Sequence, residues 1–164
     1  MILFQNKCII YSKDLCTPKE EKNMRDGFVK VAAGTPEIRV ADCIYNGERI
    51  IELMRSAAEQ GVKVMVLPEL CITGYTCGDL FLQDTLLLGA EDALARILKE
   101  TAELDMLTAV GLPVRHHNKL YNCAAVIRKG KILGIIPKSF IPNYGEFSEG
   151  RCFGPAPYKT GQTH

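Results

Sequence analysis

The sequence predicts an α+β fold in which a mixed sheet carries helices on one face. Two amphipathic helical segments alternate with strand-like apolar runs in the first two-thirds of the chain. Two further β runs then follow, joined by the turn Arg128-Lys129-Gly130-Lys131. Strands that are separated by helices pair in parallel, whereas a hairpin pairs antiparallel. The sheet is therefore expected to combine both directions.

The first strand and helix are predicted over residues 28–60. Residues 28–34, FVKVAAG, alternate and then become apolar. Asp42 can cap a helix that runs to about Gln60, and Gly61 suits its C-terminal turn. The apolar stripe of this helix consists of Cys43, Ile50, Ile51, Met54, Ala57 and Ala58.

The remaining elements follow in the same way. Residues 62–68, VKVMVLP, predict a second strand, and a second helix is expected over roughly 85–102. Residues 106–114 predict a third strand, and the hairpin occupies 120–140. The stripe of the second helix consists of Leu87, Ala90, Leu94, Ile97 and Leu98.

The two ends of the chain lack such patterns. Residues 1–23 fit no periodic element and are expected to be an extension outside the domain, with TPKEEKNMRDG as a solvated linker and Met24 as a possible start. From Ile141 to His164, Gly and Pro dominate, and no regular element is predicted. Residues 24–164 are thus expected to form one incomplete domain, because no closing helix or strand follows.

Composition argues against several classes of protein. The 164 residues carry 20 basic and 19 acidic side chains, so nucleic acid or an anionic membrane is not an expected partner. The apolar runs are too short to span a membrane, and the start lacks the organisation of a signal peptide. The seven cysteines form no CxxC pair, so we expect no metal site. These features favour a cytoplasmic chain with reduced cysteines.

Two strand ends carry the candidate chemistry. Glu69 follows one apolar strand and a proline, and Lys138 follows another apolar strand and a proline. Loops at such strand ends often build active sites. Tyr75 lies in the glycine-containing loop after the first, and Tyr144 and Glu146 lie in the loop after the second. The simpler alternative is that the two charged residues are solvated or only form an ion pair.

Three segments carry a resemblance to a known family. The segments are LPELCITGYTCGDLF, VGLPVRHHNKLYNCAAVI and PKSFIPNYGEFSEGRCF. They closely resemble the nitrilase-type (carbon–nitrogen hydrolase) glutaminase domain at the N-terminus of bacterial glutamine-dependent NAD synthetases, over residues 26–153. The Glu and Lys signatures are shared by the whole nitrilase superfamily. Residues 74–81 and 142–147 resemble this subgroup in particular.

The resemblance implies a fold and a reaction. The fold is the four-layer α-β-β-α sandwich of the nitrilase superfamily, truncated here at its C-terminal side. The domain hydrolyses glutamine to glutamate and ammonia and needs no cofactor. The ammonia amidates deamido-NAD in a synthetase domain that uses ATP and Mg and that this sequence lacks. Full-length members of the family form homo-oligomers.

The resemblance also assigns roles to residues. Glu69 is the proton acceptor, and Lys138 stabilises the thiolate and the oxyanion. Residues Tyr75, Tyr144, Glu146 and Phe147 are assigned to the substrate pocket, with Glu146 as the second acidic residue. Transfer of a proton from Cys to Glu costs roughly 5–6 kcal/mol in water, because their ordinary pKa values are about 8.5 and about 4.3. Burial of Glu69 at a strand end and a nearby Lys would reduce this cost.

The nucleophilic cysteine is predicted to be absent from the chain. In the family it follows the lysine by several dozen residues, in a strand-to-helix elbow. Here the cysteine after Lys138 is Cys152, and no apolar strand precedes it. Cys71 and Cys77 are assigned to packing or to lining the pocket, and His116-His117 to a solvated loop. The chain alone is therefore expected to be inactive.

Two other functions remain open at this point. One is a free-standing nitrilase-type amidase, similar to an ω-amidase and likewise truncated. The other is a non-catalytic interaction module on a nitrilase scaffold. The residues that follow 164 would discriminate between them. A synthetase domain favours the NAD synthetase, a stop soon after the nucleophile favours the amidase, and an immediate natural stop favours the module.

Overall fold

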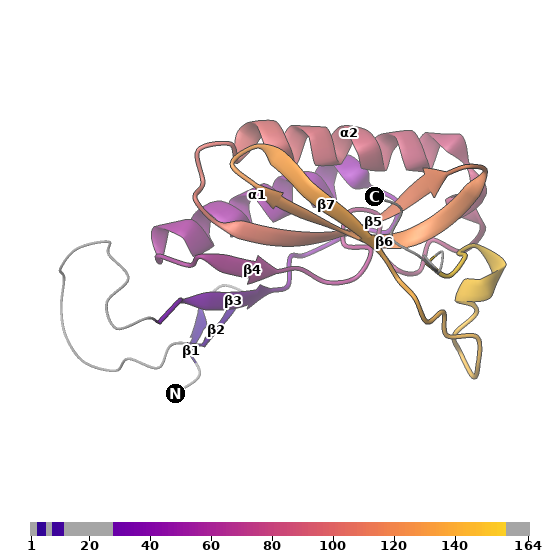
Figure 1. The fold of residues 1–164 in the computed structure, drawn as a ribbon, viewed down its shortest axis with the longest axis horizontal. Coiled ribbons are helices and arrows are strands. Elements are labelled where there is room, and N and C mark those ends of the chain that lie inside the picture. The colour runs from indigo at the N-terminus through magenta and orange to yellow at the C-terminus, as the bar shows by residue number, and fades with distance from the viewer. Residues whose placement is uncertain (1–2, 6–7, 12–27, 157–164) are drawn as a thin grey trace, which may run out of the picture.

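One mixed sheet forms the centre of the part of the chain that the structure describes (Figure 1). The structure is a computed structural model, and it describes residues 3–5, 8–11 and 28–156. The strands are β1 (Leu3–Gln5), β2 (Cys8–Tyr11), β3 (Val31–Gly34), β4 (Val64–Val66), β5 (Leu107–His116), β6 (Lys119–Arg128) and β7 (Lys131–Pro137). The helices are α1 (Cys43–Glu59) and α2 (Asp84–Glu100), with short 3-10 helices η1 (Gly78–Leu82) and η2 (Glu149–Arg151).

The strands lie in the sheet in the order in which they occur in the chain. β3 pairs with β4, and β4 with β5, in parallel, and α1 and α2 make the two crossovers. β5, β6 and β7 pair antiparallel as consecutive hairpins. The predicted mixed sheet and the order of the elements from β3 to β7 are confirmed.

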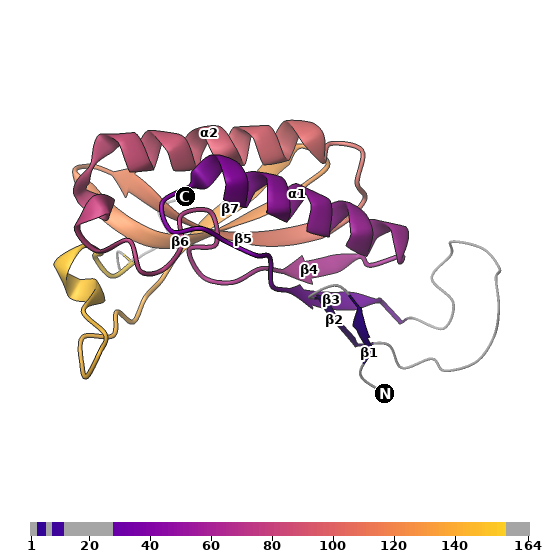
Figure 2. The same ribbon diagram turned by 180° about the vertical axis from the view of Figure 1, so that it is seen from behind.

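Both helices cover the same face of this sheet (Figures 1 and 2). α1 begins where predicted, because the Asp42 side chain accepts a hydrogen bond from the Tyr45 backbone N–H at 3.0 Å. The helices approach closely at two small residues, since a Cβ on Gly47 would lie 3.5 Å from the Ala93 Cβ. The largest fully buried side chains include Ile50, Met54, Met65, Ile97 and Val110. The core thus lies between the helix pair and the sheet.

Both hairpins turn through residues with positive φ. His117 and Asn118 have φ values of 46° and 61°, and Lys129 and Gly130 have values of 48° and 69°. Two consecutive residues with positive φ are the backbone of a type I′ turn, whose twist matches that of the flanking strands. The predicted turn at 128–131 is confirmed. His116 is the last residue of β5 and His117 opens the turn, and both side chains are exposed.

The structure differs from the sequence prediction at both ends. β1 and β2 lie within residues 1–23, where no regular element was expected, and β2 extends the sheet beside β3. These strands are three and four residues long, so alternation could not be recognised in them. After Ile141 the structure adds the single turn η2. Most of the predicted linker and residues 157–164 lie outside the described residues.

Candidate active site

Glu69 lies in the loop that follows β4. The pairing of β4 with β5 continues to Leu67, whose N–H donates to the Ala109 carbonyl at 3.0 Å. Pro68 then lacks an N–H and ends the ladder. The loop crosses directly over Gly111 of β5, because a Cβ there would lie 2.5 Å from the Pro68 carbonyl oxygen. Close contact with β5 therefore determines the position of Glu69.

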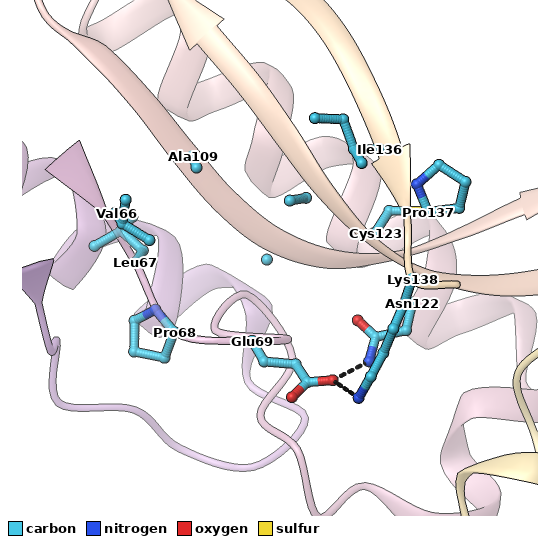
Figure 3. A pocket seen from close by; sticks show the side chains of 12 residues that line it. Val66, Leu67, Pro68, Glu69, Ala109, Asn122, Cys123, Ile136, Pro137 and Lys138 are labelled. Carbon is cyan, nitrogen blue, oxygen red and sulfur yellow. Dashed lines mark hydrogen bonds and ion pairs between the residues drawn. The ribbon is translucent and has the colours of Figure 1, made fainter. Parts of the chain in front are cut away.

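Lys138 lies directly after β7 and meets Glu69. Its backbone N–H donates to the Asn122 carbonyl of β6 at 2.8 Å, which holds it beside the sheet. Its Nζ lies 2.7 Å from Glu69 Oε1. Figure 3 shows the side chains of Glu69, Asn122 and Lys138 converging at one end of a pocket. The two strand ends that the sequence singled out are thus joined.

A second carboxylate, Glu149, completes the cluster. Its oxygens lie 2.9 Å and 3.1 Å from Lys138 Nζ, and the Tyr75 hydroxyl donates to Oε1 at 2.7 Å. Its side chain is only 5% exposed. Glu146, which the sequence put forward as the second acidic residue, is instead exposed. The structure therefore places Glu149, rather than Glu146, beside Lys138.

The reason for this difference is local. Glu149 opens the η2 turn, and Phe153, just after that turn, packs on Phe81 with ring centroids 4.9 Å apart. This contact holds the turn, and with it Glu149, against the core. Glu146 precedes the turn and stays exposed. Both glutamates follow Lys138 in a loop that contains glycine, so the pattern of residues did not distinguish them. The buried Phe153 close after Glu149 is the signal that could have done so.

The charges of the cluster shift two pKa values. Burial lowers the pKa of Lys138, but the hydrogen bonds and negative charges of Glu69 and Glu149 outweigh it and hold the pKa above its ordinary value. Burial raises the pKa of Tyr75, and its hydrogen bond to Glu149 and the nearby carboxylates raise it further. At neutral pH Lys138 is therefore an ammonium and Tyr75 a hydroxyl donor.

Glu69 is less buried than expected. Its side chain is 42% exposed, compared with 30% for Lys138. The sequence analysis expected Glu69 to be partly withdrawn from water at the end of a buried strand. In the described residues, Glu149 is the buried carboxylate instead. The loop begins at the C-terminal end of β4, an inner strand of the sheet, and there the Glu69 side chain projects partly into solvent.

The cluster lies at the mouth of a pocket of about 310 Å³. Glu69, Asn122 and Lys138 supply its polar end (Figure 3). Its apolar wall includes Val66, Ala109, Ala124 and Ile136. Side chains alternate along a strand, and Thr108 and Val110 are buried on the helix side of β5. Ala109 therefore faces the other way, and the pocket opens on the sheet face away from α1 and α2.

Aromatic residues connect the cluster to the loop after β7. The Phe147 ring lies 6.5 Å from the Tyr75 ring and 5.8 Å from the Tyr144 ring, both edge-on. Tyr144 is 72% exposed at the outer end of this row. The structure thus brings together three of the four residues that the sequence assigned to the substrate pocket, next to Glu149.

None of the cysteines in residues 28–156 forms a hydrogen bond to Glu69 or Lys138. Cys71 and Cys77 are buried in the core, as the sequence indicated. Burial raises the pKa of Cys71 to about 12 and those of Cys43 and Cys123 to about 11. Cys152 is half-buried, and its Sγ donates to the Gly78 carbonyl at 3.8 Å. These thiols are therefore poor candidates for the nucleophile.

No group of His, Cys, Asp and Glu side chains among the described residues could hold a metal ion. Neither α1 nor α2 is long and apolar enough to cross a membrane.

Comparison with known proteins identifies the family. Residues 30–163 match the carbon–nitrogen hydrolase family. The chain belongs to this family. The match begins after residues 1–23 and includes both Glu69 and Lys138. Carbon–nitrogen hydrolases are enzymes, so the chain belongs to an enzyme family.

Several relatives of this chain are glutamine-dependent NAD(+) synthetases. The glutamine-dependent NAD(+) synthetase of Mycobacterium tuberculosis is 41% identical over 129 residues, which are 79% of this chain and 19% of that protein. The synthetase of Saccharomyces cerevisiae is 38% identical over 110 residues, which are 67% of this chain and 15% of that protein. This chain thus spans less than a fifth of the length of these relatives. The resemblance found in the sequence is confirmed.

Solved structures show the same fold. The glutamine-dependent NAD(+) synthetase of Cytophaga hutchinsonii has a TM-score of 0.75 and 30% identity over 83% of this chain and 23% of its own. An amidase from Nesterenkonia sp. has a TM-score of 0.66 over 79% of this chain and 49% of its own, at 21% identity. The predicted fold class, that of the nitrilase superfamily, is confirmed. The residues described here form one mixed sheet with one layer of helices.

Proposed function

We propose that this chain is part of the glutaminase domain of a glutamine-dependent NAD synthetase. The observation that carries the proposal is the cluster of Lys138 with Glu69 and Glu149 at the mouth of a pocket. The similarity to NAD synthetases over four-fifths of the chain supports the choice of substrate. Glutamine would be hydrolysed to glutamate and ammonia, and the ammonia would amidate deamido-NAD in a synthetase domain that uses ATP and Mg. The resemblance also supports a cytoplasmic homo-oligomer.

Glu69 acts as the proton acceptor in this proposal. Its Oε1 accepts bonds from Lys138 and Asn122, and within the described residues no bond involves Oε2. Oε2 takes the proton of the nucleophilic thiol, and the sulfur attacks the amide carbon of glutamine. Glu69 returns that proton to the departing nitrogen, so that the C–N bond breaks and ammonia leaves. Water then hydrolyses the thioester and releases glutamate.

Lys138 stabilises the negative charges of this reaction. Its ammonium favours the thiolate before the attack and can donate to the oxyanion of the tetrahedral intermediate. Donors of this kind contribute roughly two to three orders of magnitude to the rate. Glu149 and Tyr75 keep the ammonium in place from its buried side. Tyr144 and Phe147 form the outer wall against which glutamine binds.

The nucleophilic cysteine lies outside these 164 residues in this proposal. Four of the five described cysteines are buried, and burial raises their pKa. Cys152 faces the Gly78 carbonyl rather than the cluster. The site described here thus supplies the base and the cation, but not the thiol.

A domain exchange tests the proposal. In the M. tuberculosis synthetase, the 129-residue segment that matches this chain is replaced by the matching segment of this chain. NAD synthesis by the chimera is then measured with glutamine and, separately, with ammonia. We expect synthesis with both. Glu69→Gln keeps the shape of the side chain but accepts no proton, so it should lower glutamine-driven synthesis about 100-fold or more and leave ammonia-driven synthesis intact.

The controls separate catalysis from folding. Glu48→Gln changes a surface carboxylate of α1 that pairs with Arg96, and should leave both activities unchanged. A chimera that uses ammonia but not glutamine would contradict the proposal. Parallel loss of both activities in Glu69→Gln would make Glu69 structural. The 164-residue chain alone should release no glutamate, and release abolished by Cys152→Ala would show that the thiol is present after all.

A further inference from the structure

We propose that Asn122 is a positioning residue of this site, which holds the Glu69 carboxylate against Lys138 so that one carboxylate oxygen stays directed at the thiol. The inference rests on the proposed function for its chemical meaning. Its geometric content, that the Asn122 amide orients Glu69, can be tested separately. The sequence analysis assigned no role to Asn122.

Asn122 contacts all three charged residues of the cluster, two through its side chain and Lys138 through its backbone. Its Nδ2 donates to Glu69 Oε1, and more weakly, at 3.5 Å, to Glu149 Oε2. Its backbone carbonyl accepts the bond from the Lys138 N–H at 2.8 Å. The residue is 4% exposed, so water does not compete for these contacts. Figure 3 shows the amide between the Lys138 chain and the Glu69 carboxylate.

A neutral donor is suited to this position. Two carboxylates share the single ammonium of Lys138, so their charges repel each other across the cluster. An amide offers N–H donors to both carboxylates without adding charge. A second cation would compete with Lys138, and an apolar side chain would leave the carboxylates without this partner.

The position on β6 makes Asn122 more rigid than Lys138. β6 pairs with β5 on one side and with β7 on the other, so its backbone is held from both edges. Lys138 holds Glu69 through a flexible four-carbon chain. Glu69 itself is 42% exposed and has little packing to orient it. The bond from Asn122 therefore stops rotation of the carboxylate about its contact with Lys138.

Asn46 shows what a structural asparagine looks like in this fold. It is fully buried, and its side chain bonds only to main-chain groups, namely the N–H and carbonyl of Arg39 and the carbonyl of Ile72. Within the part of the chain that the structure describes, the hydrogen bonds of the Asn122 side chain go to the two carboxylates of the cluster. A buried amide that is directed solely at ionised side chains points to a role in the site.

The test uses the natural gene product that contains these residues, with the variants Asn122→Leu and Asn122→Asp. A lost hydrogen bond to a charged group should lower kcat for glutamine about 10- to 100-fold, with little change in KM or in ammonia-driven synthesis. In Asn122→Asp, kcat relative to wild type should recover as the pH falls toward about 5, because a protonated Asp regains a donor. Asn122→Leu should show no such recovery.

Asn118→Asp is the matched control, since it makes the same change in the exposed turn before β6 and should alter nothing. A second readout needs no activity. Carbodiimide labelling, read by mass spectrometry, should modify Glu69 several-fold faster in Asn122→Leu than in wild type. Labelling of Glu48, a carboxylate of similar exposure that pairs with Arg96, should stay constant.

The outcomes separate this inference from the proposed function. If Asn122→Leu matched Asn118→Asp in kcat, or lost ammonia-driven synthesis to the same extent, the positioning role would be overturned while the proposed function stood. If the wild type did not hydrolyse glutamine, the proposed function would fail. The rate of Glu69 labelling would then be the deciding measurement. Faster labelling in Asn122→Leu than in wild type would support the role of Asn122, and an unchanged rate would overturn it.

Discussion

The two carboxylates beside Lys138, those of Glu69 and Glu149, differ in burial and therefore in how much stability their removal should cost. Glu149 is buried and accepts bonds from Lys138, Tyr75 and Asn122. A buried donor that loses its partner costs more than an exposed one, because water cannot replace the bond. The raised pKa of Lys138 means that these ion pairs stabilise the fold fully below its ordinary value of 10.5. That stabilisation is lost only as the pH rises through the higher folded value.

The variants Glu149→Gln and Glu146→Gln make the same chemical change at a buried and at an exposed glutamate of one loop, so comparing them tests this difference. We expect the first to lower the free energy of unfolding by about 1–3 kcal/mol, since it weakens the contacts of a buried carboxylate with the half-buried Lys138 ammonium. The second changes an exposed side chain and should stay within about 0.5 kcal/mol of wild type. Urea unfolding at pH 7 and low protein concentration measures both. Equal costs would argue that Glu149 does not hold Lys138.

At the scale of the elements, the register of the β6–β7 hairpin sets the site. Cys123 pairs with Pro137, so Asn122 and Lys138 lie opposite each other at the next position. A slip by one residue would turn Asn122 to the other face of the sheet and separate it from Glu69. The type I′ turn at Lys129-Gly130 sets the pairing of Arg128 with Lys131. An irregularity between Val126 and Ile127 then shifts the register by one residue, and this shift places Cys123 opposite Pro137.

The loop after β4 depends on β5 in a comparable way. Gly111→Ala would place a methyl group against the backbone of Pro68 and Leu70, which cannot move away as a side chain would. We expect a loss of about 1–3 kcal/mol in the free energy of unfolding and displacement of Glu69. Gly134→Ala on β7 is the control, because a Cβ there has no neighbour within 4 Å. Urea unfolding and glutamine-driven activity measure both effects, and similar values for the two variants would contradict the close approach.

At the scale of the whole molecule, the two faces of the sheet are unlike. α1 and α2 cover one face (Figure 2). On the other, Val66 and Ile136 line the pocket and are 53% and 60% exposed. An apolar surface of this kind promotes association, and so does the outer edge of β7, which no other described strand pairs with.

The 164-residue chain should therefore self-associate at micromolar concentration. Ile136→Lys should weaken the association and reduce binding of a hydrophobic dye, because it places a charge on the open face. Leu88→Lys changes an α2 residue that is also 60% exposed, and should have little effect. Sedimentation velocity over a concentration series measures this. A monomeric wild type with sharp thermal unfolding would instead favour a self-sufficient interaction module.

The sequence by itself determined the order of the elements from residue 28 to Pro137, the family and the two strand ends of the site. Each of these depends on a local pattern. Apolar spacing reveals helices and strands, Asp42 has the chemistry of a helix cap, and short motifs around Glu69 and Lys138 carry the resemblance. Such patterns can be recognised in the sequence without knowing which residues pack against them in the fold.

Only the tertiary structure decided which polar groups complete the site. Glu149 and Glu146 lie in the same loop, and the packing of Phe153 on Phe81 is what brings the first to Lys138. Asn122 lies 53 positions from Glu69 along the chain, and the pairing of β4, β5 and β6 brings them together. Contacts between residues so far apart depend on the packing of the whole fold, and the spacing of neighbouring residues in the sequence does not reveal them.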